Sequence, residues 1–193
     1  MATDPPDAFV NDLTGLLNRG MAGDSGANGQ AFDIVYDELR RSARRQMRRG
    51  GEPATFTPTS LVNEVFLKLS DGAPRAVNDR SHFYSLAARA MRQVLLDHQR
   101  GKQAIKRGSG VAALELTAEA FGTDGDGIDY FALDQALESL RAIDPRAATV
   151  VEWHFFSGLN FGEIAELLDI SDKTARRDWS SARAFLLSQL ESG

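Results

Sequence analysis

The sequence predicts an all-α protein with two small helical domains joined by a flexible acidic linker, the C-terminal domain carrying a helix-turn-helix. Apolar residues recur three and four positions apart through most of the chain, which is the period of an amphipathic helix. No segment shows the sustained apolar and polar alternation of a strand. Stretches rich in Gly, Asp, Ser and Asn interrupt the pattern at 20–29 and 122–127. We therefore expect a flexible tail, a first domain, a linker and a second domain, over 1–29, 30–108, 109–132 and 133–193.

The composition is that of a globular protein. The 193 residues include 22 Lys and Arg against 27 Asp and Glu, with a formal net charge of -5 and 42% hydrophobic residues. Because there is no cysteine, a disulfide framework, a thiolate nucleophile and a thiolate metal site are excluded. The chain starts without the basic region and apolar core of a signal peptide, and no stretch approaches a membrane span of about 20 apolar residues. We expect a cytoplasmic protein that does not enter a membrane.

The charges are segregated along the chain. Residues 31–50 hold six Arg against three acids, and residues 75–107 hold eight Lys and Arg against two acids. Between 113 and 152 the balance reverses to nine acids against two Arg. This asymmetry indicates a basic part that faces a polyanion, followed by an acidic connection to a separate module.

Three amphipathic helices are expected in the first domain. Each has an apolar stripe at helical spacing, and the third continues into a basic end at 100–107. The stripes are Phe32, Val35, Tyr36, Leu39, Ala43 and Met47 in the first; Leu61, Val62, Val65, Phe66 and Leu69 in the second; and Phe83, Leu86, Ala87, Ala90, Met91, Val94 and Leu95 in the third.

Helix starts and stops are clearest in the second domain. Asp144 followed by Pro145 is typical of an N-cap and first helical position, and Gly158 marks the end of that helix. Asn160 and Glu163 have the spacing of a capping box and predict a short helix.

A last helix follows a tight turn at 169–171, with Ser171 as its N-cap. Its inner face would be Ala175, Trp179, Ala182, Leu186 and Leu190, and its outer face Lys173, Thr174, Arg176, Arg177, Ser180 and Arg183. In a helix-turn-helix that binds DNA, the second helix enters the major groove, where Arg bonds guanine edges and Lys, Ser and Thr bond phosphates or bases. The alternative from pattern alone is an ordinary helical hairpin with a solvated basic face.

The run LDQALESLRAIDPRAATVVEWHFFSGLNFGEIAELLDISDKTARRDWSSARAFLLSQL resembles the promoter-binding C-terminal domain of bacterial sigma factors of the extracytoplasmic-function (ECF) group. TSLVNEVFLKL resembles the polymerase-binding helix of these proteins, and HFYSLAARAMRQVLLDHQR resembles their promoter-opening helix. The resemblance covers nearly all of 30–190 in the order of the family. It implies a dissociable specificity subunit whose partners are core RNA polymerase, through its clamp, and promoter DNA.

The resemblance also implies roles for single residues. Those expected to bind the minus-thirty-five element are Lys173, Thr174, Arg176, Arg177, Ser180 and Arg183; those for the minus-ten element are Arg92, Gln93, His98, Arg100 and Lys102; and those for polymerase are Thr57, Thr59, Ser60, Asn63 and Glu64. Separated strands need a positive groove and side chains that stack on or enclose a base. Phe83 is expected in the core rather than against a base. An anti-sigma factor is a further possible partner.

The chain departs from the family at the start of the polymerase-binding helix. The family usually has an acidic run there, whereas this sequence has Thr57, Pro58, Thr59 and Ser60, which can cap a helix but carry no negative charge. We hypothesise that a Ser/Thr protein kinase phosphorylates Thr59, Thr57 or Ser60, because a phosphate adds roughly -1.5 to -2 charge at a helix end that favours anions. Thr59 is favoured because the second helical residue should point outward. The alternative is that the hydroxyls only cap the helix.

Two further departures are Leu86, where the family often has Trp, and Asp178 among the arginines of the last helix. Asp178 is interpreted as an acceptor from cytosine, as an orienting partner of a neighbouring Arg, or as a solvated partner of Thr174.

An enzyme, a stand-alone regulator and an adaptor are the alternatives to a sigma factor. No phosphate-binding loop, nucleophile elbow or calcium loop is complete, and His82, His98 and His154 lack metal-ligand spacing, so we expect neither an enzyme nor a cofactor or metal site. A stand-alone helix-turn-helix regulator would bind duplex DNA without polymerase, usually as a dimer. An adaptor would bind polymerase or a kinase without reading a promoter. The second basic module favours the sigma factor.

Overall fold

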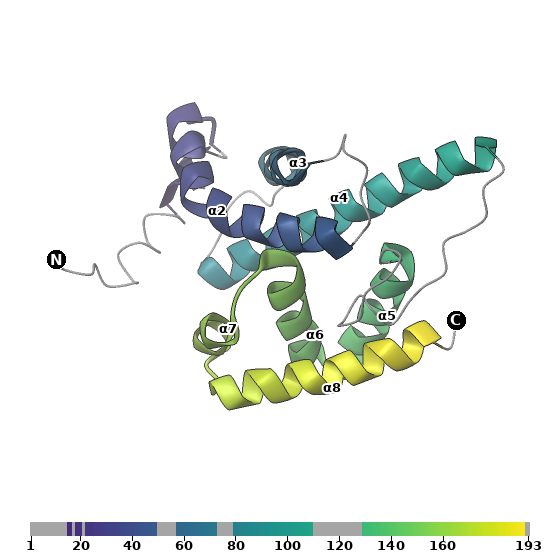
Figure 1. Cartoon of the computed structure of the whole chain (residues 1–193). Helices are drawn as coiled ribbons and strands as arrows, with labels where there is room; N and C mark the ends of the chain where they lie inside the picture. The colour runs from purple at the N-terminus through teal and green to yellow at the C-terminus, as the bar shows by residue number, and fades with distance from the viewer. Residues whose placement is uncertain are drawn as a thin grey trace.

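Two groups of helices build the fold of this computed structural model (Figure 1). The structure describes residues 15–16, 18–20, 22–49, 57–72, 79–109 and 129–191, and all regular elements within these ranges are helical. The predicted all-α class is therefore confirmed. Within the same ranges no helix is both long and apolar enough to cross a membrane.

The N-terminal group consists of α2 (Ser25–Arg49), α3 (Pro58–Gly72) and α4 (Arg80–Ser109), with α3 in contact with both neighbours. The 30 residues of α4 give it a length of about 45 Å. Most described residues of the predicted stripes are buried, with Leu39, Leu61 and Val65 fully buried and Phe83 only 2% exposed, whereas Tyr36, Phe66 and Leu86 are half-buried. Phe83 is thus a core residue, as expected, and its neighbour Tyr84 is also buried.

Part of the segment expected as a flexible tail, 1–29, is helical. Residues 15–16 and 18–20 are helical, and α2 begins at Ser25. Asp24 Oδ1 accepts a hydrogen bond of 3.0 Å from the Ala27 amide, which caps the helix, and both Leu16 and Ala27 belong to the core. The cap and this burial offset the conformational cost of the glycines that suggested a loose segment.

The C-terminal group consists of α5 (Tyr130–Ile143), α6 (Pro145–Glu152), the π-helix η2 (Trp153–Ser157), α7 (Phe161–Leu168) and α8 (Asp172–Glu191). The predicted caps are confirmed: Asp144 Oδ1 accepts from the Ala147 amide at 3.0 Å, and Asn160 and Glu163 form a reciprocal capping box. The group begins earlier than the expected 133, because Asp129 caps α5. The expected linker lies almost wholly outside the described residues, which resume at 129.

The π-helix was not expected from the sequence, which predicted one helix ending at Gly158. Gly158 does end it, with the left-handed φ of 85° that favours glycine. The π-helix before it has a wider turn, and Trp153, Phe155, Phe156 and Ser157 in it are buried, whereas His154 is half-buried.

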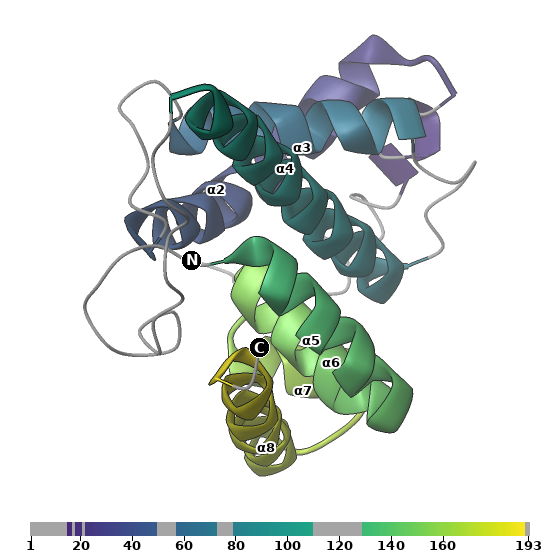
Figure 2. The ribbon, with the colours of Figure 1, turned by 90° about the vertical axis from the view of Figure 1, so that its right-hand side faces the viewer.

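The C-terminal group lies against the side of α4 (Figure 2). The two groups of helices pack against each other through η2, which contacts both α2 and α4. Ser42 Oγ on α2 donates to the Phe156 carbonyl at 2.6 Å, and Ser157 Oγ donates to the Tyr84 carbonyl on α4 at 2.9 Å. Both serines are at most 1% exposed. Trp153 Nε1 donates to Ser85 Oγ at 3.1 Å beside them.

We predict that Gly158→Ala destabilises the fold by about 2 kcal/mol, because a non-glycine residue in this conformation is strained. The new Cβ would also meet the guanidinium of Arg45 and lie 3.1 Å from Ser42 Cβ. Urea unfolding measures the change. Gly101→Ala is the control: its Cβ would meet no atom within 4 Å in the helical backbone of α4, so it should stabilise by about 0.5–1 kcal/mol. A Gly158→Ala protein as stable as the parent would contradict the prediction.

Candidate nucleic-acid interface

The pair α7 and α8 forms a short helix, a tight turn and a longer helix. Asp169 ends α7 in the left-handed conformation, with φ 52°. Ser171 Oγ accepts from the Thr174 amide at 3.1 Å and caps α8, as predicted. In both whole-chain views α8 lies on the side of the C-terminal group away from α4 (Figures 1 and 2).

The outer face of α8 carries the predicted basic and hydroxyl residues. Its inner face packs on α6 through Ala175, Ala182 and Leu186, which are at most 1% exposed. The six predicted residues share the opposite side, where four are exposed and two half-buried: Lys173, Arg176, Arg177 and Ser180, then Thr174 and Arg183. The sequence therefore identified this face correctly, and its chemistry suits phosphates and base edges.

Arg176 is held in place on this face. Its Nε donates to Asp172 Oδ2 at 2.7 Å, one turn earlier, and its guanidinium carbon lies 4.8 Å from the ring centroid of Phe161. That ring is stacked on His154 with centroids 4.4 Å apart. Such a cation–π contact restricts the rotamers of a long side chain that is still 61% exposed.

Asp178 is an acidic partner of arginine, which agrees with one of its three interpretations. It is 5% exposed, and its carboxylate receives Arg146 Nε at 2.7 Å and Arg146 Nη2 at 3.3 Å from α6. Arg177 Nη2 lies at 3.8 Å from the same carboxylate, and the hydrogen bond raises the pKa of Arg146. The solvated interpretation and the cytosine contact are therefore wrong for this buried side chain, which fastens α8 to α6.

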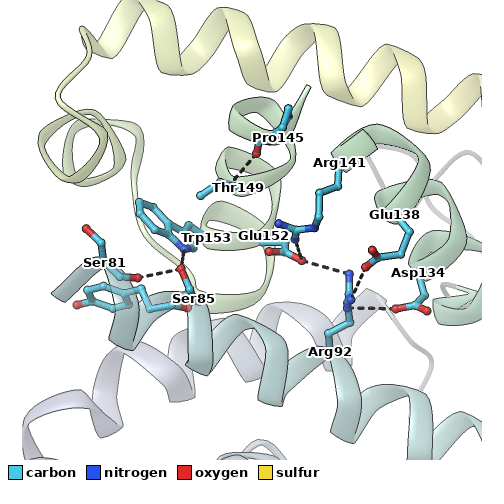
Figure 3. A network of polar contacts seen from close by, with 12 residues as sticks. Ser81, Ser85, Arg92, Asp134, Glu138, Arg141, Pro145, Thr149, Glu152 and Trp153 are labelled. Atoms are coloured by element: carbon cyan, nitrogen blue, oxygen red, sulfur yellow. Dashed lines mark hydrogen bonds and ion pairs between the residues drawn. The ribbon is translucent and has the colours of Figure 1, made fainter. Parts of the chain in front are cut away.

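Arg92, predicted for the minus-ten element, is enclosed by carboxylates of the C-terminal group (Figure 3). Its Nε lies 3.1 Å from Asp134 Oδ1, its Nη2 2.7 Å from Glu138 Oε1, and its Nη1 3.1 Å from Glu152 Oε1. Arg141 Nη2 also pairs with Glu152, at 2.6 Å. The hydrogen bond from Arg92 to Glu138 lowers the pKa of Glu138. The hydrogen bond from Arg141 to Glu152 raises the pKa of Arg141.

The other residues predicted for the minus-ten element lie on different sides of α4. Gln93 is exposed and donates to Asp97 Oδ1 at 2.9 Å, whereas His98 is half-buried. Arg100 pairs with Asp97 at 3.1 Å, and its guanidinium carbon lies 5.4 Å from the ring centroid of Phe131 on α5. The side chain of Lys102 lies outside the described part of the chain.

Asp97 has three polar partners, Lys68 on α3 and Gln93 and Arg100 on α4. Burial raises its pKa, but hydrogen bonds from Lys68 and Gln93 outweigh that effect and lower the pKa overall. Among the described residues no group of His, Asp or Glu side chains could hold a metal ion. The acidic side chains of this region are matched with arginine and lysine instead.

The predicted polymerase-binding residues lie at the start and on the outer face of α3. Thr57 and Ser60 cap each other: Thr57 Oγ1 accepts from the Ser60 amide at 3.1 Å, and Ser60 Oγ accepts from the Thr57 amide at 2.8 Å. Thr59 is exposed, as expected, and takes no part in this cap. Asn63 and Glu64 are exposed one turn later.

Leu67 was not among the residues predicted for this face of α3, yet its side chain is 59% exposed there. It falls outside the apolar stripe of α3 and one turn after Asn63 and Glu64, so its position on the helix was a usable signal.

A short helix, a tight turn and a basic second helix have the arrangement of DNA-binding proteins of the helix-turn-helix class. The family model of the ECF sigma factor matches residues 10–192, and the chain belongs to this family. It is therefore a sigma factor with a role in transcription initiation, and core RNA polymerase and promoter DNA are the partners of its family. Searches of curated proteins and of solved structures found no significant match.

We predict that Asp178→Asn lowers the thermal midpoint of the protein, because it removes the charge that pairs with Arg146 from a buried site. The sequence preference of the DNA complex should change little, since the 3.8 Å contact between the carboxylate and the exposed Arg177 is long for an ion pair. Differential scanning calorimetry and binding selection measure the two effects. Asp172→Asn, an exposed acid of the same helix, is the control and should leave the midpoint nearly unchanged. A changed base preference in Asp178→Asn would restore the readout role.

Proposed function

We propose that this chain directs core RNA polymerase to promoters through three surfaces, each on one helix. The outer face of α8 reads the minus-thirty-five element as duplex, the basic side of α4 binds the minus-ten element, and the outer face of α3 binds the polymerase clamp. The proposed function is supported by the family, by the position of α8 and by the chemistry of the three surfaces.

The observation that carries the proposal is the outer face of α8. Arg176 and Arg177 are 61% and 71% exposed, and Lys173 and Ser180 are exposed beside them, over a helix whose opposite side is firmly packed. A rigid helix presents such side chains to a groove with little loss of conformational entropy on binding. Because several of these groups suit phosphates, affinity should fall by about 0.9 log units per log unit of salt for each phosphate neutralised.

The α3 surface supports a polymerase contact that depends on phosphorylation. Thr59 is exposed in the first turn of α3, where backbone amides and the helix dipole favour an anion. The first turn of α3 contains no acidic residue. A phosphate on Thr59 would supply this charge without breaking the cap, whereas a phosphate on Thr57 or Ser60 would replace a hydroxyl that stabilises it. A Ser/Thr kinase is therefore a proposed partner.

We predict that Arg177→Ala removes the upstream block of the DNA motif recognised by the chain with core polymerase. The measurement is selection of duplexes from a random library, in which the unchanged complex should enrich two separated blocks. Arg41→Ala, which removes an exposed arginine on α2, is the control and should retain both blocks. A motif enriched equally without polymerase would support a stand-alone regulator instead. Full activity of Arg176→Glu/Arg177→Glu would support an adaptor.

We predict that Thr59→Glu binds core polymerase more tightly than Thr59→Ala, by up to about fivefold, because an exposed ion pair with a basic group of the clamp contributes roughly 0.2–1 kcal/mol. Chain treated with a Ser/Thr kinase should exceed both. Gln30→Glu, which adds one negative charge at an exposed position of α2, is the control and should bind as the parent does. Equal binding by Thr59→Glu, Thr59→Ala and kinase-treated protein would contradict a switch at this residue.

A further inference from the structure

A cluster of three aromatic rings lies where η2, α7 and α8 meet, beside the outer face of α8. His154 of η2 is stacked on Phe161 of α7, with ring centroids 4.4 Å apart and an interplanar angle of 18°. Trp179 of α8 meets His154 edge to face, with centroids 4.7 Å apart. All three side chains are half-buried, and Phe161 and Trp179 pack against the hydrophobic core. The cluster therefore joins the core of the C-terminal group to its basic face.

The ring of His154 is fixed by a hydrogen bond across the turn that follows η2. Its Nδ1 lies 2.8 Å from the carbonyl oxygen of Leu159. Because a carbonyl oxygen only accepts, Nδ1 carries a proton and donates the hydrogen bond. This bond and the edge contact with Trp179 hold the imidazole in its orientation, so that one face of the Phe161 ring stays covered.

Arg176 reaches the ring of Phe161 from the outer face of α8. Its guanidinium carbon lies 4.8 Å from the centroid of that ring, and its Nε pairs with Asp172 Oδ2 at 2.7 Å. The ion pair engages Nε, and the terminal nitrogens carry the other N–H donors, which suit a guanine edge or a phosphate. A long side chain that is 61% exposed loses much rotamer freedom when it is fixed. Phe161 and Asp172 supply an order that burial does not.

We propose that Phe161, backed by His154, is a positioning residue for promoter recognition, because it orders Arg176 before DNA is bound. The inference rests on the proposed function for the duplex that Arg176 contacts, whereas the order of Arg176 is a property of the free chain. Immobilising a long side chain on binding weakens a complex about twofold to tenfold, and an arginine that is ordered in advance avoids this loss. The gain is confined to the base or phosphate that Arg176 bonds.

The order of Arg176 is tested in the free chain by nitrogen-15 relaxation. Phe161→Leu, which keeps the position apolar but removes the ring, should lower the order parameter of Arg176 Nε. Phe161→Tyr keeps a ring and should retain the order. Phe185→Leu removes another half-buried ring of the C-terminal group, on α8, and is the matched control that should leave Arg176 unchanged. An order parameter that is the same in the parent and in Phe161→Leu would overturn the proposal.

The unmodified chain gives a second measurement that needs no variant. Arg176 Nε should be more ordered than Arg177 Nε, because the side chain of Arg177 is 71% exposed and its ion pair with Asp178 is long, at 3.8 Å. Equally low order at the two arginines would contradict a restraint on Arg176, even if Phe161→Leu failed to fold. Circular dichroism verifies that each variant is folded.

The consequence for DNA is tested by a double-mutant cycle on the complex with core polymerase. The affinity for a promoter duplex should fall about twofold to tenfold in Phe161→Leu, but not in Phe161→Tyr or Phe185→Leu. In an Arg176→Ala background, Phe161→Leu should cause no further loss, because a positioning residue acts only through the residue that it positions. Equal losses in the two backgrounds would mean that Phe161 serves general packing, and the proposal would be wrong.

Selection of duplexes from a random library adds a measurement at single base pairs. Phe161→Leu should weaken the preference at the same positions as Arg176→Ala and at no others. If Arg176→Ala changes neither preference nor affinity, the proposed DNA contact of Arg176 fails, and the recognition role of Phe161 fails with it. If Arg176→Ala weakens recognition and Phe161→Leu does not, the proposed function stands and only the positioning role fails.

Discussion

The last carbonyls of a helix have no hydrogen-bond partner within that helix. In this chain the partners come from the other group of helices, and these hydrogen bonds hold the two groups together. The π-helix η2 ends in the core, where water cannot satisfy the carbonyls of Phe155 and Phe156. Ser42 on α2 supplies the missing donor, and Ser157 returns a hydrogen bond to the Tyr84 carbonyl on α4. An unpaired buried carbonyl would cost about 1–3 kcal/mol, so η2 is most stable when seated against both helices. The other contacts between the two groups of helices, including the ion pairs of Arg92, lie beside these hydrogen bonds and depend on the position of η2.

Local signals predicted the local structure well. The caps Asp144, Asn160 and Ser171 are all confirmed. Each cap bonds the amide that lies three positions later in the sequence, so the signal is local. The outer face of α8 was also found, because helical periodicity alone separates it from the core. The glycines between 20 and 29 suggested a loose segment, whereas Asp24 caps α2 within the same stretch. This signal is also local.

Long-range contacts could not be predicted in this way. The bond from Ser42 to Phe156 joins positions 114 apart in sequence, and nothing in the surroundings of either residue indicates the other. The interpretations of Asp178 named DNA, solvent or a neighbouring Arg, but not its partner Arg146, which lies on another helix 32 positions away. The π-helix was not predicted either, because its contacts are with α2 and α4, which are distant in sequence.

The sequence analysis identified the segregation of charge along the chain. It did not predict that the acidic stretch pairs with the basic one in the folded chain. The basic stretch of α4 was assigned to a polyanion and the acidic stretch to a connection, whereas Asp134, Glu138 and Glu152 of that stretch bind Arg92 in the folded chain. The two interpretations are compatible, because a carboxylate cluster and a DNA phosphate offer the same oxygen acceptors to one guanidinium.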